Sequence, residues 1–159
     1  MSTVKNQSFL FLFLLIFSVL SCKSVKPVSP ESTTETSSAI PFTFDFAESE
    51  KLTPLLDQAL AEKKLIFVDF YADWCLPCKM MEKDVFVDKE LGTYFNTHFI
   101  NYKVDAEKGN GVNLAQIFNI KAYPTLLFLN EKGQVLERKE GAAYHSELKA
   151  MARRALAKQ

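Results

Sequence analysis

One stretch of the chain decides how the rest is interpreted: Phe67-Val68-Asp69-Phe70-Tyr71-Ala72-Asp73-Trp74-Cys75-Leu76-Pro77-Cys78-Lys79. The run from Leu65 to Tyr71 is short and almost continuously apolar, which is typical of a central strand covered on both faces. Two cysteines follow, and the proline between them suits the first turn of a helix, where its missing N–H would be unpaired anyway. We therefore expect a buried strand that leads directly into a helix carrying a Cys-x-x-Cys pair.

This position activates the first cysteine. Unpaired backbone N–H groups and the positive end of the helix dipole stabilise a thiolate, so the pKa of Cys75 should fall below the free value of about 8.5. Cys78 lies one helical turn further on and can resolve a mixed disulfide before the substrate dissociates. The placement of the pair therefore predicts thiol–disulfide exchange.

Three other uses of the pair stay open. Half of a zinc site would need two further ligands, but the chain has no second Cys-x-x-Cys, and His98 and His145 stand alone, so we expect no metal. A purely structural disulfide would close so small a loop that it would stabilise the fold little. The pair could also be the degenerate site of a binding module.

The third cysteine, Cys22, belongs to the N-terminus. An apolar run from Phe9 to Leu20 follows a polar start with one lysine, and it is too short to span a bilayer. It is typical of a secretory signal peptide. The sequence Val19-Leu20-Ser21-Cys22 resembles a bacterial lipoprotein box, so we expect cleavage of residues 1–21 and lipidation of Cys22. Ordinary cleavage, with or without a free Cys22, is the alternative.

Composition divides the remaining 138 residues into two parts, taking the signal peptide as the first 21 of 159. Residues 22–40 are rich in Ser, Thr, Pro and Glu and cannot bury enough apolar surface to fold, so we expect a tether of about 25 Å average reach. Residues 41–159 have the pattern of a globular domain. Lys+Arg and Asp+Glu both number 19, which gives no basic field that would favour nucleic acid.

Hydrophobic periodicity and turn residues predict the elements of this domain. Helices are expected at 53–64, 75–84, 88–97, 112–118 and 146–157, and strands at 65–71, 99–104, 125–129 and 134–138. This order indicates an α/β domain with a mixed sheet, in which crossover helices join parallel pairs and one hairpin is antiparallel.

The motifs resemble those of the thioredoxin family. Residues 67–79 are similar to its active-site strand and helix start, and Tyr123-Pro124-Thr125 is similar to its cis-proline loop. Gly133 and Gly141 fall where its hairpin turn and following bulge would be. The resemblance covers about residues 45–157 and implies a thioredoxin fold, a central mixed sheet flanked by helices. The Tyr-Ala-Asp-Trp-Cys variant and Glu82-Lys83-Asp84-Val85-Phe86 most resemble the thioredoxin-like domain of thiol:disulfide interchange proteins in the bacterial envelope.

The resemblance assigns catalytic roles to three residues. Cys75 is the attacking thiolate, Cys78 the resolving thiol, and Asp69 the buried carboxylate behind them. Burial would raise the pKa of Asp69 and fit it to take and return the proton of the resolving thiol. Alternatively, Asp69 lies at the edge of the core and is satisfied by the backbone.

Five further residues are implied to bind substrate: Trp74, Leu76, Pro77, Tyr123 and Pro124. A cis Pro124 would bring the backbone of Tyr123 opposite Cys75, where a substrate strand can pair with it. Trp74 would flank the sulfur atoms as an apolar wall, unless it simply packs in the core.

Two positions depart from thioredoxin itself. Leu76 replaces the common glycine and makes the entrance to the site more apolar. The lysine that faces the buried aspartate in thioredoxin aligns with Asn101, and Lys103 lies on the same face one pleat later. Either Lys103 substitutes for that lysine, or Asp69 has no cationic neighbour.

These features lead to one main hypothesis. We expect a monomeric thiol-disulfide oxidoreductase that needs no cofactor beyond its redox-active disulfide and reduces protein disulfides while anchored by lipid on the periplasmic side of the envelope. A membrane thiol reductase is a candidate electron donor. The alternatives are a disulfide-donating oxidase or isomerase, a non-catalytic peptide-binding module, and a soluble periplasmic or secreted location.

Overall fold

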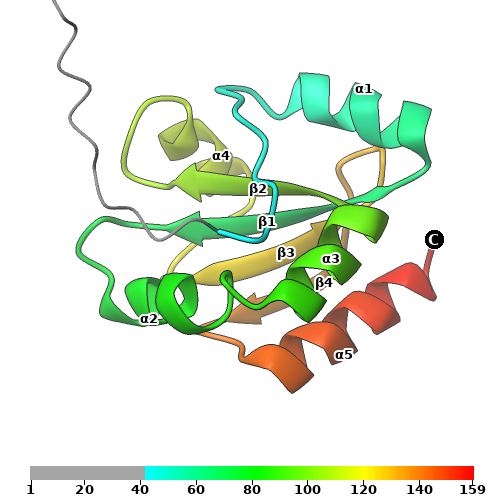
Figure 1. Cartoon of the computed structure of the whole chain (residues 1–159). Helices are drawn as coiled ribbons and strands as arrows, with labels where there is room; N and C mark the ends of the chain where they lie inside the picture. The colour runs from blue at the N-terminus through cyan, green and yellow to red at the C-terminus, as the bar shows by residue number, and fades with distance from the viewer. Residues whose placement is uncertain (1–41) are drawn as a thin grey trace, which may run out of the picture. The chain divides into compact units, whose positions relative to one another are not determined.

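The computed structural model describes residues 42–159. The expected signal peptide, the lipidated Cys22 and the tether lie outside the described residues, so they stay predictions. Within 42–159 the chain contains five helices and four strands in the expected order (Figure 1). They are α1 Thr53–Glu62, β1 Leu65–Tyr71, α2 Leu76–Asp84, α3 Lys89–His98, β2 Phe99–Asp105, α4 Gly111–Ile117, β3 Thr125–Leu129, β4 Val135–Glu140 and α5 His145–Leu156.

The four strands form one sheet in the order β2-β1-β3-β4. β1 is parallel to β2, and β3 is antiparallel to both β1 and β4. The mixed sheet is confirmed, but the expectation of several parallel pairs is wrong, because only β1 and β2 are parallel among the described strands. The connection explains this. The connection through the seven-residue helix α4 leads the chain from the end of β2 back to the same edge of the sheet, so β3 begins near the end of β1, with Thr125 opposite Phe70.

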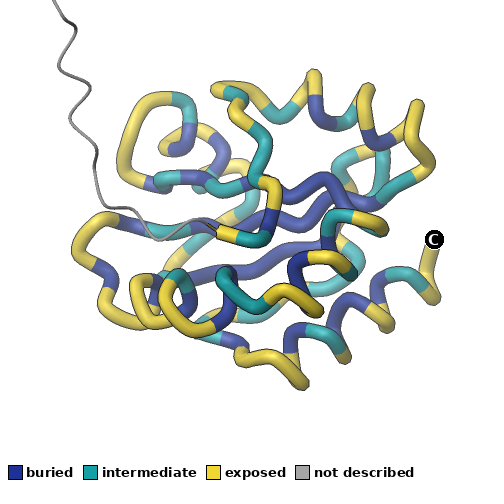
Figure 2. The backbone as a smooth tube through the Cα atoms, viewed as in Figure 1, coloured by how far each residue is buried: buried dark blue, intermediate teal, exposed yellow. Residues whose placement is uncertain are grey.

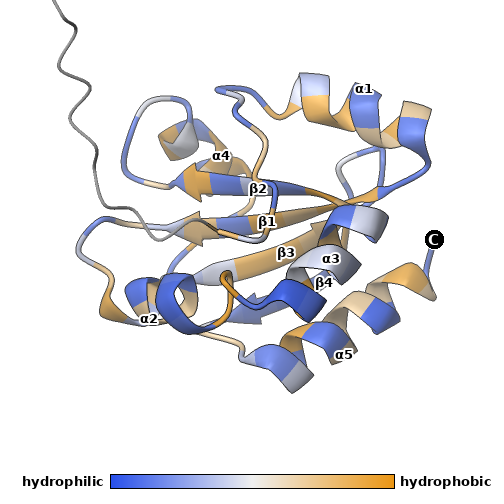
Figure 3. Ribbon diagram, in the orientation of Figure 1, coloured by the Kyte–Doolittle hydropathy of each residue, from blue (hydrophilic) through white to orange (hydrophobic). Residues whose placement is uncertain are grey.

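Two apolar cores lie on opposite faces of the sheet. Helices α1 and α4 cover one face, and α2, α3 and α5 cover the other (Figure 1). The alternating side chains of β1 contribute to both cores, which explains why this strand is apolar at nearly every position. Figure 2 shows the central strands β1 and β3 buried along nearly their whole length, and Figure 3 shows that they are mostly hydrophobic.

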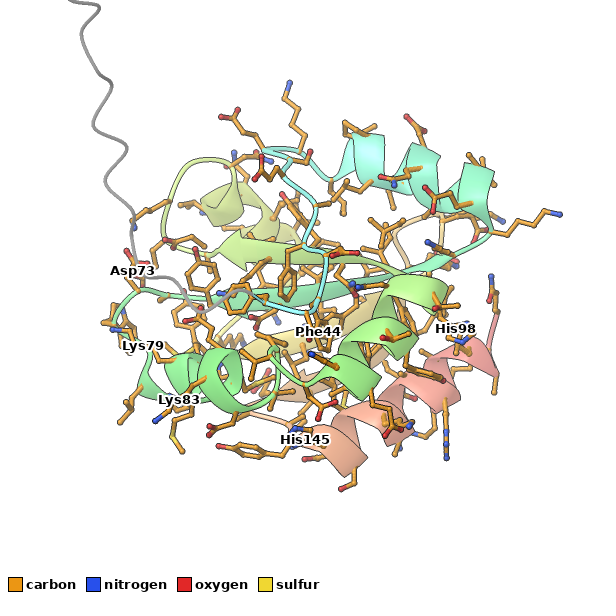
Figure 4. All side chains as sticks on the ribbon, in the orientation of Figure 1. Phe44, Asp73, Lys79, Lys83, His98 and His145 are labelled. Carbon is orange, nitrogen blue, oxygen red and sulfur yellow. A yellow bond between two sulfur atoms is a disulfide. The ribbon has the colours of Figure 1, made fainter. Side chains whose placement is uncertain are left out.

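Phenylalanine fills the core under α2 and α3. Phe67, Phe95, Phe99 and Phe128 are fully buried, with ring centroids of neighbouring pairs 5.0–6.1 Å apart. Phe44 joins this cluster from the segment before α1 (Figure 4), with its ring centroid 4.9 Å from that of Phe95. Met81 of α2 packs in the same core as these rings, so α2 and β1 share one close-packed core, and the cysteine pair follows β1 at the start of α2.

Candidate active site

The two cysteines form a disulfide at the start of α2. Their Cα atoms are 5.3 Å apart, and both residues are buried. Cys75 is the N-cap of the helix, and the backbone N–H of Cys78 donates to Cys75 Sγ at 3.2 Å. The helix begins at Leu76, one residue after the predicted start. The structure therefore holds the oxidised pair and already has one donor directed at the sulfur that would carry the thiolate.

Trp74 and Leu76 form an apolar rim around the buried sulfur atoms. They are 69% and 68% exposed, so the core-packing alternative for Trp74 is wrong. The indole N–H of Trp74 donates to Glu107 Oε2 at 2.9 Å, and its ring meets that of Tyr123 edge to face at 5.8 Å. Pro77 is also exposed in the first turn of α2. These residues surround the disulfide with a surface that another chain can contact.

The loop before β3 completes the rim. The peptide bond between Tyr123 and Pro124 is cis, and Tyr123 packs against the cluster of Ala72 and the two cysteines. Pro124 is buried, and its carbonyl accepts a hydrogen bond from the N–H of Gly141 at 2.7 Å. Gly141 has φ +89°, a conformation that a residue with a side chain rarely adopts. The chain after β4 therefore fixes the loop that carries Tyr123.

Asp69 lies on β1 as a buried carboxylate. The residue is 1% exposed, and its Oδ1 atom has no hydrogen-bond partner within residues 42–159. Burial raises its pKa to about 6, although the charge of Lys103 opposes that rise. The structure therefore does not have the alternative arrangement, in which backbone groups of the described residues would form hydrogen bonds with the Asp69 carboxylate. A carboxyl group with a pKa near neutrality can both accept and return a proton.

Lys103 is the cation beside Asp69. The two residues are opposite each other in the parallel register of β1 and β2, and Lys103 Nζ lies 3.8 Å from Asp69 Oδ2. Asn101 is opposite Phe67 instead, and its side-chain amide donates to Asn96 Oδ1 at 2.8 Å. Of the two alternatives left by the sequence, the structure has the one in which Lys103 takes the place of the usual lysine.

Sequence reasoning missed two contacts of this lysine. Glu82 Oε1 lies 2.7 Å from Lys103 Nζ, and the ring of Tyr71 lies beneath the ammonium group, with its centroid 3.2 Å away. Both had a signal in the sequence. Glu82 follows Cys78 by four residues on α2, one turn along the same face, and Tyr71 follows Asp69 by two residues on the same face of β1.

The family comparison agrees with this geometry. Residues 48–154, about two thirds of the chain, match the family model described as Thioredoxin. The chain belongs to the thioredoxin family. The cis-proline loop and the Cys-x-x-Cys pair at a helix start are thus thioredoxin features in place, and the predicted fold is confirmed.

Relatives and solved structures of the thioredoxin family match most of the domain. The chain is 37% identical over 90 residues to the thiol:disulfide interchange protein DsbD of Haemophilus ducreyi, a match of 53% of this chain but only 16% of that protein. It is 36% identical over 90 residues to thioredoxin H4 of Arabidopsis thaliana, covering 57% of this chain and 71% of that one. The solution structure of a candidate disulphide-isomerase from Bacteroides thetaiotaomicron has a TM-score of 0.65 and 40% identity, covering 76% of this chain and 99% of that one.

The pair Cys75–Cys78 in this fold is that of a thioredoxin-type thiol-disulfide oxidoreductase. In the part of the chain from 42 to 159, no helix has the length and apolar character needed to cross a membrane. Within the same residues, no three His, Cys, Asp or Glu side chains are grouped as metal ligands would be.

Proposed function

We propose that this protein reduces disulfides of other proteins in the bacterial envelope, with Cys75 as the attacking thiolate and Cys78 as the resolving thiol. One observation carries the proposal. The cysteine pair lies at a helix N-terminus with the Cys78 N–H directed at Cys75 Sγ, on the side of the sheet where Asp69 is buried. This arrangement favours a thiolate at Cys75 and supplies a base for the second step.

The first step begins from the reduced pair. The thiolate of Cys75 attacks one sulfur of the substrate disulfide, a new Cys75–substrate disulfide forms, and the other substrate sulfur leaves as a thiolate. The N–H of Cys78 lowers the free energy of the attacking thiolate, as the 3.2 Å contact in the oxidised state suggests.

The second step releases the substrate. Asp69 takes the proton of the Cys78 thiol, and the resulting thiolate attacks Cys75 Sγ. The Cys75–substrate bond breaks, the second substrate thiolate leaves, and the pair ends as the disulfide in the structure. Two electrons have passed from the cysteine pair to the substrate. Since the pKa of Asp69 is about 6, its carboxylate is mostly ionised at pH 7 and still basic enough to receive this proton.

The rim around the disulfide would bind the substrate chain. Trp74, Leu76 and Pro77 offer exposed apolar surface on one side of the pair. On the other side, the backbone N–H and C=O of Tyr123 have no hydrogen-bond partner within residues 42–159, and the residue packs against the two cysteines. An extended substrate segment can therefore pair with Tyr123 while its cysteine reaches Cys75.

The cellular setting follows from the N-terminus. A lipoprotein-type signal peptide and lipidation of Cys22 would place the protein on the periplasmic side of the envelope, attached through the tether 22–40. A membrane thiol reductase would then restore the dithiol, in keeping with the likeness to DsbD. The redox group would be the disulfide itself, without a bound cofactor, and the protein would act as a monomer.

A second candidate function is disulfide isomerisation, which the name of the Bacteroides thetaiotaomicron relative favours. The reduction potential separates the two functions. Thioredoxin-like reductants have potentials of about −270 mV, protein disulfide isomerase about −180 mV, and strong oxidants about −120 mV. Equilibration of the Cys75–Cys78 pair with glutathione buffers, followed by thiol alkylation, measures this value.

The activity test uses insulin as substrate and dithiothreitol as electron source. The chain is produced without its signal peptide and with Cys22→Ala, so that Cys75 and Cys78 are the only cysteines. This protein should accelerate insulin reduction, and Cys75→Ser should abolish the acceleration. Activity equal to the parent in the Cys75→Ser variant would contradict the proposal and favour a peptide-binding module.

A further inference from the structure

We propose that Glu82 is a positioning residue that holds the ammonium group of Lys103 away from Asp69 and so preserves Asp69 as a proton acceptor. This inference deepens the proposed function and rests on it for the role of Asp69. The arrangement itself is a property of three side chains from three elements: Asp69 on β1, Glu82 on α2 and Lys103 on β2.

The contacts of Lys103 are unequal. Its Nζ atom lies 2.7 Å from Glu82 Oε1, a distance typical of a charge-assisted hydrogen bond. The distance to Asp69 Oδ2 is 3.8 Å, which is too long for a hydrogen bond. The ring of Tyr71 lies under the same ammonium group at 3.2 Å. Lys103 is therefore bound to Glu82 and Tyr71 and only lies near Asp69.

Position in the sheet alone would favour the opposite pairing. Lys103 and Asp69 are directly opposite in the register of adjacent strands, and within residues 42–159 the Oδ1 atom of Asp69 has no hydrogen-bond partner that would compete for it. A flexible lysine in that place would be expected to close on the buried carboxylate. Glu82 comes from α2, one turn after Cys78, and binds the ammonium group instead.

Among the residues that the structure describes, the other charged side chains around this site form no ion pair with Asp69. The exposed lysines of α2, Lys79 and Lys83, extend away from the sheet (Figure 4), so Lys103 is the one cation paired with Asp69 within residues 42–159. On β3, Leu126 pairs with Asp69 and Thr125 pairs with the next residue of β1, Phe70; both β3 residues are uncharged. On its outer side Lys103 lines a groove with Asp105 and Lys108, whose side chains pair with each other at 3.1 Å.

The separation of 3.8 Å between Lys103 Nζ and Asp69 Oδ2 has a chemical consequence. An opposite charge in direct contact lowers the pKa of a carboxyl group by about 1–3 pH units. A closed Asp69–Lys103 pair would therefore be a poor acceptor for the proton of Cys78. In the structure, burial keeps the pKa of Asp69 at about 6, Lys103 opposes this only in part, and the negative charge of Glu82 supports it.

The test is a carbon-13 NMR titration of the Asp69 carboxyl group in the oxidised protein. Glu82→Gln keeps the size of the side chain and removes its charge, so Lys103 should move to Asp69 and the titration midpoint should fall by about one pH unit. Lys103→Met should raise the midpoint. In the Lys103→Met background, Glu82→Gln should have less than half of its original effect, because Glu82 acts mainly through Lys103.

Glu90→Gln is the matched control, since Glu90 forms a 2.6 Å ion pair with Lys149 between α3 and α5. It should leave the Asp69 midpoint unchanged. Glu82→Ala repeats the experiment if the glutamine variant does not fold. The inference is overturned if the midpoint stays in place in the Glu82 variants, or if it falls equally with and without Lys103. The titration needs no substrate, so a protein without insulin reductase activity would contradict the proposed function and leave this result standing.

Discussion

Replacing Asp69 by Asn should stabilise the folded protein at neutral pH. The wild-type carboxylate is buried, its Oδ1 atom has no hydrogen-bond partner within the described residues, and it faces a lysine that is bound more closely to Glu82. Burying this charge raises the free energy of the folded state, whereas water solvates the same carboxylate in the unfolded chain. Asn has nearly the same shape and no charge, and Lys103 keeps its contacts with Glu82 and Tyr71.

The size of the effect follows from linkage. The pKa of Asp69 is raised from 3.8 to about 6, a difference of about two pH units, and each unit corresponds to 1.36 kcal/mol. The folded state thus binds this proton more tightly than the unfolded state. Its contribution to stability is fully present below about pH 4, is lost as the pH rises to about 6, and changes little above that. Asp69→Asn should therefore gain about 3 kcal/mol relative to wild type between pH 3 and pH 8.

Urea unfolding of the oxidised proteins, followed by circular dichroism at several pH values, measures this difference. A buried amide has its own cost, but that cost is independent of pH and cancels in the comparison. Asp57→Asn, at an exposed position of α1, is the control and should leave the pH dependence unchanged. Parallel stability curves for wild type and Asp69→Asn from pH 4 to pH 8 would refute the reasoning, since they would mean that Asp69 is not a buried titrating group.

Three further predictions concern substrate and anchor. Cys78→Ser should accumulate mixed disulfides between Cys75 and its substrates, seen on non-reducing gels; adducts on Cys78 in a Cys75→Ser variant would reverse the two roles. Glu107→Ala removes the acceptor of the Trp74 indole, so KM for insulin should rise about two- to fivefold while stability changes by less than about 0.5 kcal/mol; an unchanged KM would argue against a role for the rim. Cys22→Ala should abolish labelling by a fatty-acid analogue, and mass spectrometry that finds an unmodified N-terminus at or beyond Cys22 would contradict the lipid anchor.

Local features of the sequence were sufficient to predict nearly all elements of the domain. The apolar run of β1 is continuous because its side chains enter both cores, and this is visible without a structure. The start of α3 is local in the same way, since Asp88 precedes the helix and accepts from the N–H of Leu91. The position of the cysteine pair directly after that strand was enough to predict that the pair lies at the start of a helix. These features depend on residues close together in the chain.

Choices between distant partners were not predictable in the same way. Asn101 and Lys103 both point toward the α2 side of the sheet, and only the register with β1 decides which one lies opposite Asp69. The preference of Lys103 for Glu82 over Asp69 depends on about 1 Å of distance between groups on three elements. A sequence pattern contains no information at that scale.

The direction of β3, which the sequence did not predict, is what assembles the site. Because β3 is antiparallel to β1, its first residue Thr125 pairs with Phe70 near the end of β1, and Pro124 lies beside the loop that leads to Cys75. A parallel β3 would begin at the opposite edge of the sheet, about 20 Å away at 3.3 Å per residue. Tyr123 would then be out of reach of the disulfide, and a substrate strand could not pair with it while reacting. The antiparallel direction of β3, reached through α4, therefore places the cis-proline loop beside the cysteine pair.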